Sequence, residues 1–598
     1  MSYLNVPRIH FSGRFFTDPS TVNNDPTHYD PECTNPSPWQ EPNGQHRFQL
    51  KNCLIKSILG ENGYVSSDPL IGSELVSTDQ PSPAKIVDLD VYQQGVSTIY
   101  GLELKINLPD GGSIKGLMTP TALNDCWFNC VLPKRSWNPS DYTMDSFGGD
   151  MNAAGFFQSI ITIKKEDWKD TSSDVLQKLK QVTYSDDNGY QLSLKFTLDG
   201  YRNVPEDLDF RTGRITGAIG PYFETEPLFN PGKQWLFPRA FSETQAWNWP
   251  SFNNCPFAVD EARSTLILDL SNGICRQNAG GPPVDLGTLS AVVDLPDGQK
   301  VNLGKVDYSA FSYDNNAQIC ELPLTSDQVS AIYQGSLSLI MSREDLGEQT
   351  VLKGKASVLD YAAEVRSVRM EGNPGTKAST TVYCSINGKP VADKQLGIHI
   401  ESVHGNTPGA TVPPNSPGNT PQADGAIKAG ITPSDANGFA EVTIEVLRDP
   451  GRRTEELDGQ LYFIIVYDPN AEKPDWSKVA PAQNHLISCV AWSQYETNKN
   501  PEWAEIEKMM APYMKLYPFM KQRIDLSDEH SFGVYANNPP WEAVYFTKRV
   551  GPLGITRGAI PFYMSVDFDD PRFMPLSRDL SPSRIMTIMY YIKNLQSQ

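Results

Sequence analysis

The chain has 598 residues, among them 47 prolines and 44 glycines, and 39% of its residues are hydrophobic. This length exceeds what one hydrophobic core supports, and frequent turn residues favour short strands, so roughly two to four mainly β domains are expected. The formal net charge is −20 and the longest basic groupings are pairs of residues. This argues against nucleic acid as a partner, because an acidic surface repels a phosphate backbone.

The opening stretch MSYLNVPRIHFSGRF does not have the pattern of a secretion signal. Pro7, Arg8 and His10 stand where such a signal needs an unbroken apolar run. No later segment reaches the roughly 20 apolar residues that a membrane span requires. The nine cysteines are widely spaced, which fits buried thiols better than a disulfide framework. A cytoplasmic location is expected, with secretion by a non-classical route as the alternative.

Residues 17–48 are rich in Pro, Asn and Asp, a composition that predicts a long loop without regular structure. The loop contains His28, Asp30 and Glu32. An imidazole and two carboxylates are ligand types that metal ions accept, so these residues form one candidate metal site. The alternative is plain surface covering.

From residue 50 onward the hydrophobic pattern has a period of two, which is typical of half-buried strands. Apolar and polar residues alternate over 102–108, and the run ends in the turn Leu108-Pro109-Asp110-Gly111. The same turn recurs at Leu295-Pro296-Asp297-Gly298. Proline sets one turn dihedral and glycine accepts positive φ, so a hairpin is predicted at each place. We therefore predict a large β-rich domain, sandwich-like or barrel-like, over residues 1–365.

Two short helices are predicted within this β-rich domain. The first covers residues 175–182 and is capped by a serine at 172 or 173. The second covers residues 329–333, where Thr325 and Gln328 form a capping-box pattern before the apolar residues.

Aromatic residues are dense between positions 223 and 252, where prolines keep the segment irregular. Such a segment can line an apolar pocket for a planar or hydrophobic molecule. Ordinary core between two sheets is the alternative. The candidate ligand-binding residues are Phe223, Phe229, Trp235, Phe237, Trp247 and Trp249.

Residues 366–470 are predicted to form a separate β-sandwich. Asn387-Gly388 indicates a tight hairpin, and Asp435-Ala436-Asn437-Gly438 precedes the alternating run FAEVTIEV. The pattern NGKPV followed by DANGFAEVTIEV resembles bacterial Ig-like domains, which usually space domains or mediate binding. His399 and Glu401 lie on a predicted strand of this module, as a metal-ligand pair or as exposed polar residues.

Residues 471–598 are predicted to form an α+β segment that packs back on the first domain. One helix is expected to begin at Pro501 with Asn500 as its cap, and a second begins after Ser581-Pro582. Their apolar stripes are typical of core packing. The first stripe consists of Trp503, Ile506, Met510 and Tyr513, and the second of Ile585, Met586, Ile588, Met589 and Ile592.

Two polar clusters in this C-terminal segment could carry chemistry. Ser527-Asp528-Glu529-His530 offers His530 as a general base, although a helix start explains the same residues. Asp567, Asp569 and Asp570 could bind calcium, which prefers carboxylate oxygens. Calcium is the one cofactor that these patterns indicate.

Three stretches resemble the VioB family of violacein biosynthesis, whose members couple two indole-pyruvate imine units. They are Pro7-Arg8-Ile9-His10-Phe11-Ser12-Gly13, the segment LKFTLDGYRNVPEDLDFRTGRITGAIGPYFETEP, and Met574-Pro575-Leu576-Ser577-Arg578-Asp579-Leu580-Ser581. Tyr517-Pro518-Phe519-Met520 is a further landmark in the same order. The resemblance implies the N-terminal portion of such a protein. The ferritin-like region that is thought to carry the coupling chemistry lies beyond the matched part.

Two classes of function follow from these patterns. The resemblance implies an accessory protein that binds a hydrophobic small molecule, such as a pigment or a pathway intermediate. The alternative is an enzyme of specialised metabolism, of cyclase or coupling type and without a classical catalytic motif. It would act by shaping a reactive intermediate or with a metal at one of the carboxylate clusters, and His10 and His530 are its candidate catalytic residues. An extracellular structural protein is a third option, suggested by the Ig-like module. Assembly into a homo-oligomer is left open.

Overall fold

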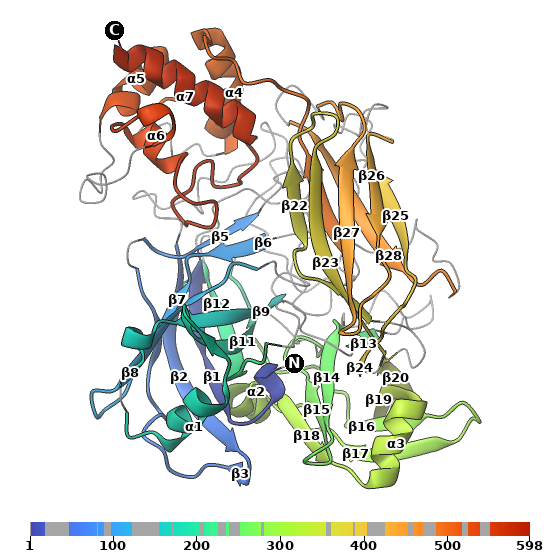
Figure 1. Cartoon of the computed structure of the whole chain (residues 1–598). Helices are drawn as coiled ribbons and strands as arrows, with labels where there is room; N and C mark the ends of the chain where they lie inside the picture. The colour runs from blue at the N-terminus through green and yellow to red at the C-terminus, as the bar shows by residue number, and fades with distance from the viewer. Residues whose placement is uncertain are drawn as a thin grey trace.

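The computed structural model confirms a mainly β protein, with 43% strand and 18% helix among the residues that it describes. Several sheets, among them a half-barrel and a nearly closed barrel, fill the N-terminal and middle parts of the chain, and most helices lie at the C-terminal end (Figure 1). The structure describes residues 2–17, 47–79, 82–88, 97–121, 155–169, 171–202, 208–224, 235–238, 252–274, 276, 280–354, 360–386, 389–402, 425–452, 458–470, 486–516, 524–538 and 551–597.

The first sheet has ten strands in the order β3-β2-β1-β12-β11-β9-β8-β7-β4, with β10 paired to β11. Alternation places Leu104 and Ile106 in its core, as the period of two predicted. Ser173 caps the covering helix α1 (Asp174–Val182), and a separate ribbon joins β5 (Lys85–Asp88) and β6 (Ser97–Tyr100). The ten strands are β1 (Arg8–Thr17), β2 (Phe48–Gly60), β3 (Gly63–Tyr64), β4 (Leu75–Ser77), β7 (Glu103–Asn107), β8 (Ser113–Met118), β9 (Gly155–Ile163), β10 (Ser185–Asp186), β11 (Gly189–Asp199) and β12 (Thr212–Pro221).

The second sheet has eight strands in the order β17-β16-β19-β20-β13-β14-β15-β18 and a hydrophobic core of its own. Both expected hairpins are present, at 107–113 and 294–300. Helix α3 (Ser326–Gln334) begins with the predicted capping box of Thr325 and Gln328. The strands are β13 (Trp235–Pro238), β14 (Cys255–Asp260), β15 (Thr265–Asp269), β16 (Thr288–Asp294), β17 (Lys300–Lys305), β18 (Ile319–Pro323), β19 (Ser336–Arg343) and β20 (Gly347–Lys353).

Helix α2 (Ala310–Asn316) joins the two sheets through its C-terminal end. The last carbonyls of a helix have no partner within the helix, so they need donors from elsewhere. Hydroxyls of the first sheet supply these donors. Ser12 donates to the carbonyl of residue 314 at 2.7 Å, Ser57 to that of residue 315 at 2.6 Å, and Thr216 to that of residue 313 at 3.0 Å.

A buried ion pair lies between the same two sheets. Lys195 Nζ on β11 is 2.8 Å from Asp269 Oδ2 on β15, and both side chains are at most 1% exposed. Tyr3, in the short helix η1 (Ser2–Leu4), donates its hydroxyl to Asp269 Oδ2 at 2.9 Å. Burial lowers the pKa of Lys195, while Asp269 opposes that shift. The pair therefore needs both members, because either charge alone would be buried without compensation.

The predicted sandwich has a five-stranded and a four-stranded sheet. Their pairing runs past both ends of the expected range 366–470, because Asp360–Ala363 pairs with β23 and Leu486–Ala491 with β28. The first sheet contains β21 (Asp360–Ala363), β23 (Lys377–Ile386), β24 (Lys389–Pro390), β26 (Ile427–Ile431) and β27 (Phe439–Val446), and the second contains β22 (Ser367–Met370), β25 (Gly397–Ser402), β28 (Gln460–Tyr467) and β29 (Leu486–Ala491).

The C-terminal helices are α4 (Trp503–Leu516), α5 (Glu529–Asn537), α6 (Ala559–Tyr563) and α7 (Pro582–Ser597), with the short helix η8 (Pro552–Gly554). Both predicted stripes enter their shared core, with the exception of Met586, which is partly exposed. The expected start at Pro501 is wrong, because α4 begins at Trp503. Asn500 is not its cap, because Glu502 directly precedes the helix and its carbonyl accepts the Glu505 amide at 3.1 Å. The Asn500 amide instead donates to Asn498 Oδ1 at 3.0 Å in the preceding turn.

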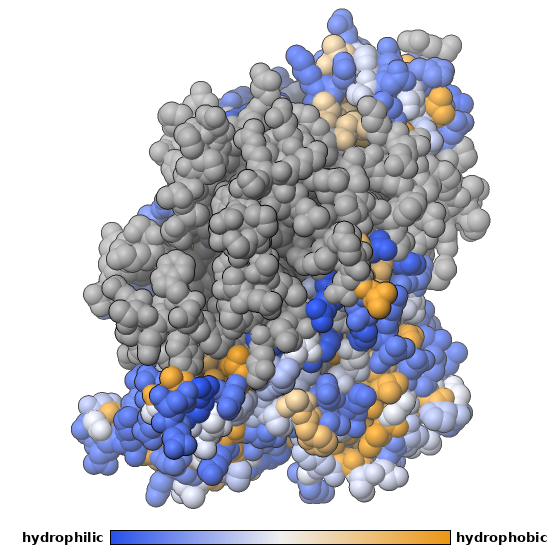
Figure 2. Space-filling model, turned by 180° about the vertical axis from the view of Figure 1, so that it is seen from behind, coloured by the Kyte–Doolittle hydropathy of each residue, from blue (hydrophilic) through white to orange (hydrophobic). Residues whose placement is uncertain are grey.

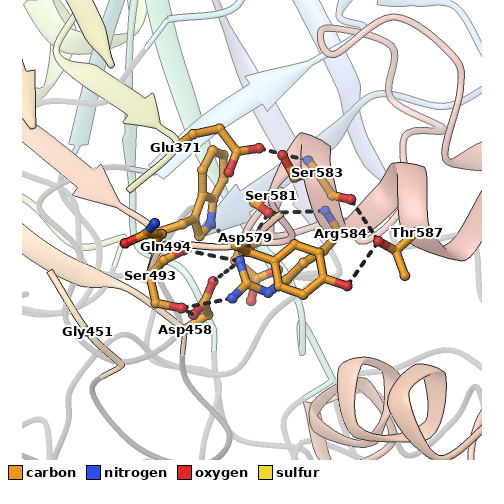
Figure 3. A network of polar contacts seen from close by, with 12 residues as sticks. Glu371, Gly451, Asp458, Ser493, Gln494, Asp579, Ser581, Ser583, Arg584 and Thr587 are labelled. Atoms are coloured by element: carbon orange, nitrogen blue, oxygen red, sulfur yellow. Dashed lines mark hydrogen bonds and ion pairs between the residues drawn. The ribbon is translucent and has the colours of Figure 1, made fainter. Parts of the chain in front are cut away.

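A network of polar contacts joins the C-terminal helices to the sandwich (Figure 3). Arg584 of α7 lies 2.9 Å from Asp458 and donates to Ser493 Oγ at 2.8 Å. The backbone amide of Ser583 donates to Glu371 at 2.7 Å. The C-terminal segment also contacts the N-terminal part of the chain. The Arg578 guanidinium, just before α7, lies 3.5 Å from the ring centre of Tyr100 on β6.

The five cysteines within the described chain are buried free thiols, in agreement with the sequence analysis; they are Cys53, Cys255, Cys320, Cys384 and Cys489. Among the described helices, none combines the length and the apolar composition that a bilayer crossing requires. Figure 2 shows hydrophilic side chains over much of the described surface at the back, with hydrophobic residues scattered between them.

Removing one member of the buried pair tests its role in joining the sheets. We expect Asp269→Asn to lower the free energy of unfolding by about 3–5 kcal/mol, because Lys195 is left buried without a counter-charge. Asp345→Asn is the matched control, since its carboxylate pairs with Arg343 at the surface, and little or no loss of stability is expected there. Urea unfolding followed by tryptophan fluorescence measures both. Equal midpoints for the two variants would contradict the expectation.

Candidate functional site

A cavity of about 450 Å³ lies where β1, β2 and β12 meet α2 and the turn at 280–281. Its described wall combines the first sheet and the residues that follow β11 with helix α2 and the loop residue Gly280. The described lining residues are Ser12, Gly13, Arg14, Asn52, Lys56, Gly200, Arg202, Asp209, Gly213, Arg214, Gly280 and Asp314.

The described wall carries more positive than negative charge, although the chain as a whole is acidic. Four lining residues are basic, namely Arg14, Lys56, Arg202 and Arg214, and two are acidic, namely Asp209 and Asp314. A concave site of one sign concentrates ligands of the opposite sign. The cavity is therefore suited to an anion.

Two β-bulges in the pairing of β1 with β2 lie at the cavity. His10 pairs with Ser57 and Phe11 with Ile55, so Lys56 has no partner and forms the first bulge. The second bulge falls between Ser12 and Arg14, and opposite it Asn52 takes a left-handed backbone with φ 52°. Bulges change the direction of side chains and occur often at functional sites.

Arg214 is held at the wall by three contacts. Its Nε donates to Asp199 Oδ1 at 2.8 Å, its Nη2 donates to the Gly281 carbonyl at 3.2 Å, and its guanidinium carbon lies 4.7 Å from the ring centre of Tyr313. Burial alone lowers the pKa of Arg214, but Asp199 outweighs this effect and the pKa is raised. Arg214 is therefore a fixed positive charge.

Arg14 is also paired, but closer to solvent. Its Nη2 lies 2.9 Å from Asp209 Oδ1 and donates to Thr212 Oγ1 at 2.7 Å. The Arg14 side chain is 41% exposed. A bound molecule can therefore reach Arg14 without a change in the buried core.

Glycines form part of the wall and let backbone come close. A Cβ atom at Gly13 would lie 2.5 Å from Cys53 Cα, and one at Gly213 would lie 2.5 Å from the Phe15 ring. Gly280 has φ +69°, a conformation that side chains rarely adopt. Larger residues at these positions would displace the strands that shape the cavity.

The candidate bases His10 and His530 lie in different parts of the molecule. His10 is fully buried, where it accepts a hydrogen bond from Arg8 Nε at 2.9 Å and contacts Ser57 Oγ at 2.9 Å. Burial, followed by the charge of Arg8, lowers its pKa well below the usual value. His530 is exposed in the first turn of α5, which Asp528 caps. The residues around His530 thus form a helix start.

The aromatic candidates are only partly described. Trp235 is buried on β13, with its ring centre 5.4 Å from that of Phe156, so it packs between the first two sheets. Phe223 and Phe237 are half-buried. Phe229, Trp247 and Trp249 lie outside the described residues, and their role in ligand binding stays a prediction.

The candidate metal ligands are not assembled within the described part of the chain. No group of three or more His, Cys, Asp or Glu side chains there is arranged to hold a metal ion. Asp570 is instead paired with Arg572 at 2.6 Å, while Asp569 is exposed at the surface. Partial desolvation raises the pKa of Asp569. The Asp567 carbonyl accepts the Asp570 amide at 2.8 Å, so these aspartates share a turn. His28, Asp30 and Glu32 lie outside the described residues.

A small apolar pocket of about 70 Å³ lies among the C-terminal helices and is lined by residues such as Met510, Tyr513 and Met574. Pockets for drug-sized ligands usually measure about 300–1,000 Å³. The charged cavity falls within this range and the apolar pocket does not. The charged cavity is therefore the candidate site.

No protein-family model and no curated protein sequence matches this chain. Among solved structures, domains 1–6 of the surface-layer protein SbsC match with 10% identity and a TM-score of 0.14, over 75% of this chain and 45% of that one. A second structure of this surface-layer protein, rSbsC(31-844), gives 8% identity and a TM-score of 0.14, over 75% and 53%. A 1.5-MDa bacterial ice-binding adhesin gives 7% identity and a TM-score of 0.10, over 67% and 90%.

The chain thus spans about half the length of the two surface-layer structures. All three TM-scores lie far below the level of a shared fold. The case for function therefore rests on the cavity itself.

The close approach at Gly13 can be tested by substitution. Gly13→Ala places a methyl group against the Cys53 backbone, and we expect a loss of about 1–3 kcal/mol in the free energy of unfolding. In Gly430→Ala the added methyl group meets no atom within 4 Å, so the thermal midpoint should stay near that of the unchanged protein. A Gly13 variant as stable as this control would show that the strands are not closely packed there.

Proposed function

We propose that this protein binds a small anionic molecule in the cavity between its first sheet and helix α2. The observation that carries the proposal is a cavity of about 450 Å³ with four basic and two acidic lining residues in a chain of net charge −20. Its volume is typical of small-molecule sites. Its fixed charges and glycine-lined wall are typical of a preformed site.

The resemblance to the VioB family supports an accessory role in specialised metabolism. Ser12 and Gly13 come from the first stretch that resembles the family, and Gly200, Arg202, Asp209, Gly213 and Arg214 come from the second. They make up seven of the twelve described lining residues. The proposed role is to hold a pathway intermediate, and the proposed location is the cytoplasm. An intermediate with an acidic group would suit the cavity, whose described lining consists of charged residues, polar residues and glycines.

Binding measurements on the full chain test the proposal. Benzoate, citrate and inorganic phosphate are titrated by isothermal calorimetry, and at least one should bind with an affinity that falls as salt is added. Arg14→Gln should weaken this binding by roughly ten-fold, since one charge-assisted hydrogen bond contributes about 1.5–3 kcal/mol.

Arg343→Gln provides the matched control for that measurement. Arg343 also pairs with a surface aspartate, Asp345, and it does not line the cavity. Its removal should leave the affinity unchanged. Absence of binding for all three anions, or equal losses in the two variants, would overturn the proposed function.

A further inference from the structure

Lys56 differs from the three arginines that line the cavity, because all three have partners, and two of them form ion pairs with aspartates. Arg14 faces Asp209 and Arg214 faces Asp199, each at less than 3 Å. Lys56 makes no ion pair or hydrogen bond through its ammonium group with any residue that the structure describes. Its side chain is only partly exposed. A partly buried ammonium without a counter-charge favours a bound anion, because the anion replaces lost hydration.

The backbone gives Lys56 its position. The residues on either side of it, Ile55 and Ser57, pair with β1, while Lys56 itself is passed over. In a regular pair of strands, successive side chains point to opposite faces of the sheet. The extra residue of a bulge breaks this alternation. The bulge thus places Lys56 in the cavity wall while Ile55 stays in the hydrophobic core.

We infer that Lys56 forms the ion pair with the ligand of this cavity and that the ligand is a monoanionic carboxylate. This inference rests on the proposed function. One carboxylate balances the one lining ammonium that has no partner within the described chain. A second anionic group would meet Asp209 and Asp314 in the same wall, and like charges at close range weaken binding.

Three probes of matched shape test the charge class. Benzoate is a monoanion, benzamide is its neutral analogue, and phthalate carries a second carboxylate on the same ring. Isothermal calorimetry on the full chain should show benzoate as the tightest binder of the three. Tighter binding of phthalate would overturn the monoanion assignment, and equal binding of benzamide would overturn the ion pair.

Substitutions at Lys56 test its role in binding the ligand. Lys56→Gln should weaken benzoate binding by roughly ten-fold or more and leave benzamide binding unchanged. Lys56→Arg should restore most of the affinity because it restores the charge. Lys305→Gln is the control, since it removes the same charge from an exposed position on β17, and it should bind benzoate as the unchanged protein does.

The outcomes separate the two claims. If the unchanged protein binds no anion, the proposed function fails and this inference fails with it. If benzoate binds equally to Lys56→Gln and to Lys305→Gln, only the role of Lys56 is refuted. Should Lys56→Gln fold poorly, the same comparison is made with Lys56→Met. In the unchanged protein, the affinity for benzoate must fall as salt is added, and the affinity for benzamide must not.

Discussion

Neutralisation of charges that are buried between the first two sheets is the constraint on which the rest of this structure depends. Lys195 and Asp269 come from different sheets, and each would be costly to bury without the other. Arg8 on β1 and Glu321 on β18 form a second such pair at 2.6 Å. These pairs join one sheet to the other, and helix α2, which contacts both β18 and the first sheet, closes one side of the cavity.

The same interface explains why the cavity is polar. Helix α2 turns its C-terminal end toward the first sheet, so hydroxyls from β1, β2 and β12 must satisfy its last carbonyls. A strand surface that already carries such polar groups can hold further charges at low cost. Arg14 and Arg214 extend this polar face along the cavity wall. The bulge in β2 places Lys56 in the same wall.

The C-terminal stretch that resembles the VioB family has a structural role in this chain. Arg578 is fully buried and donates to the carbonyls of Phe568, Asp570 and Leu576, while its guanidinium lies over Tyr100. The Asp579 carbonyl accepts from the Trp492 indole at 2.6 Å. Residues 574–581 therefore join the C-terminal helices to β6 and to the sandwich. Residues of the two earlier stretches, 7–13 and 194–227, line the cavity.

The sequence by itself determined many of the strands and hairpins and several of the helices, but it missed α2 and the strand β13. Alternation of apolar residues, the two Pro-Asp-Gly turns and the capping box of Thr325 and Gln328 are local signals, and each element depends on contacts within a few residues. The helix start expected at Pro501 was wrong. Asn498 accepts the Asn500 amide and is itself held by Thr587 of α7, a contact between residues far apart in the chain.

Only the tertiary structure decided which charged residues share a site. Lys56, Arg214 and Asp314 are far apart in sequence and belong to no motif, so no local pattern indicated them. Arg202 and Arg214 lie in the stretch that resembles the VioB family, which was the one signal that could have drawn attention to them. The pairing register of β1 with β2 and the docking of α2 bring these residues together, and both depend on long-range contacts that a sequence pattern does not encode.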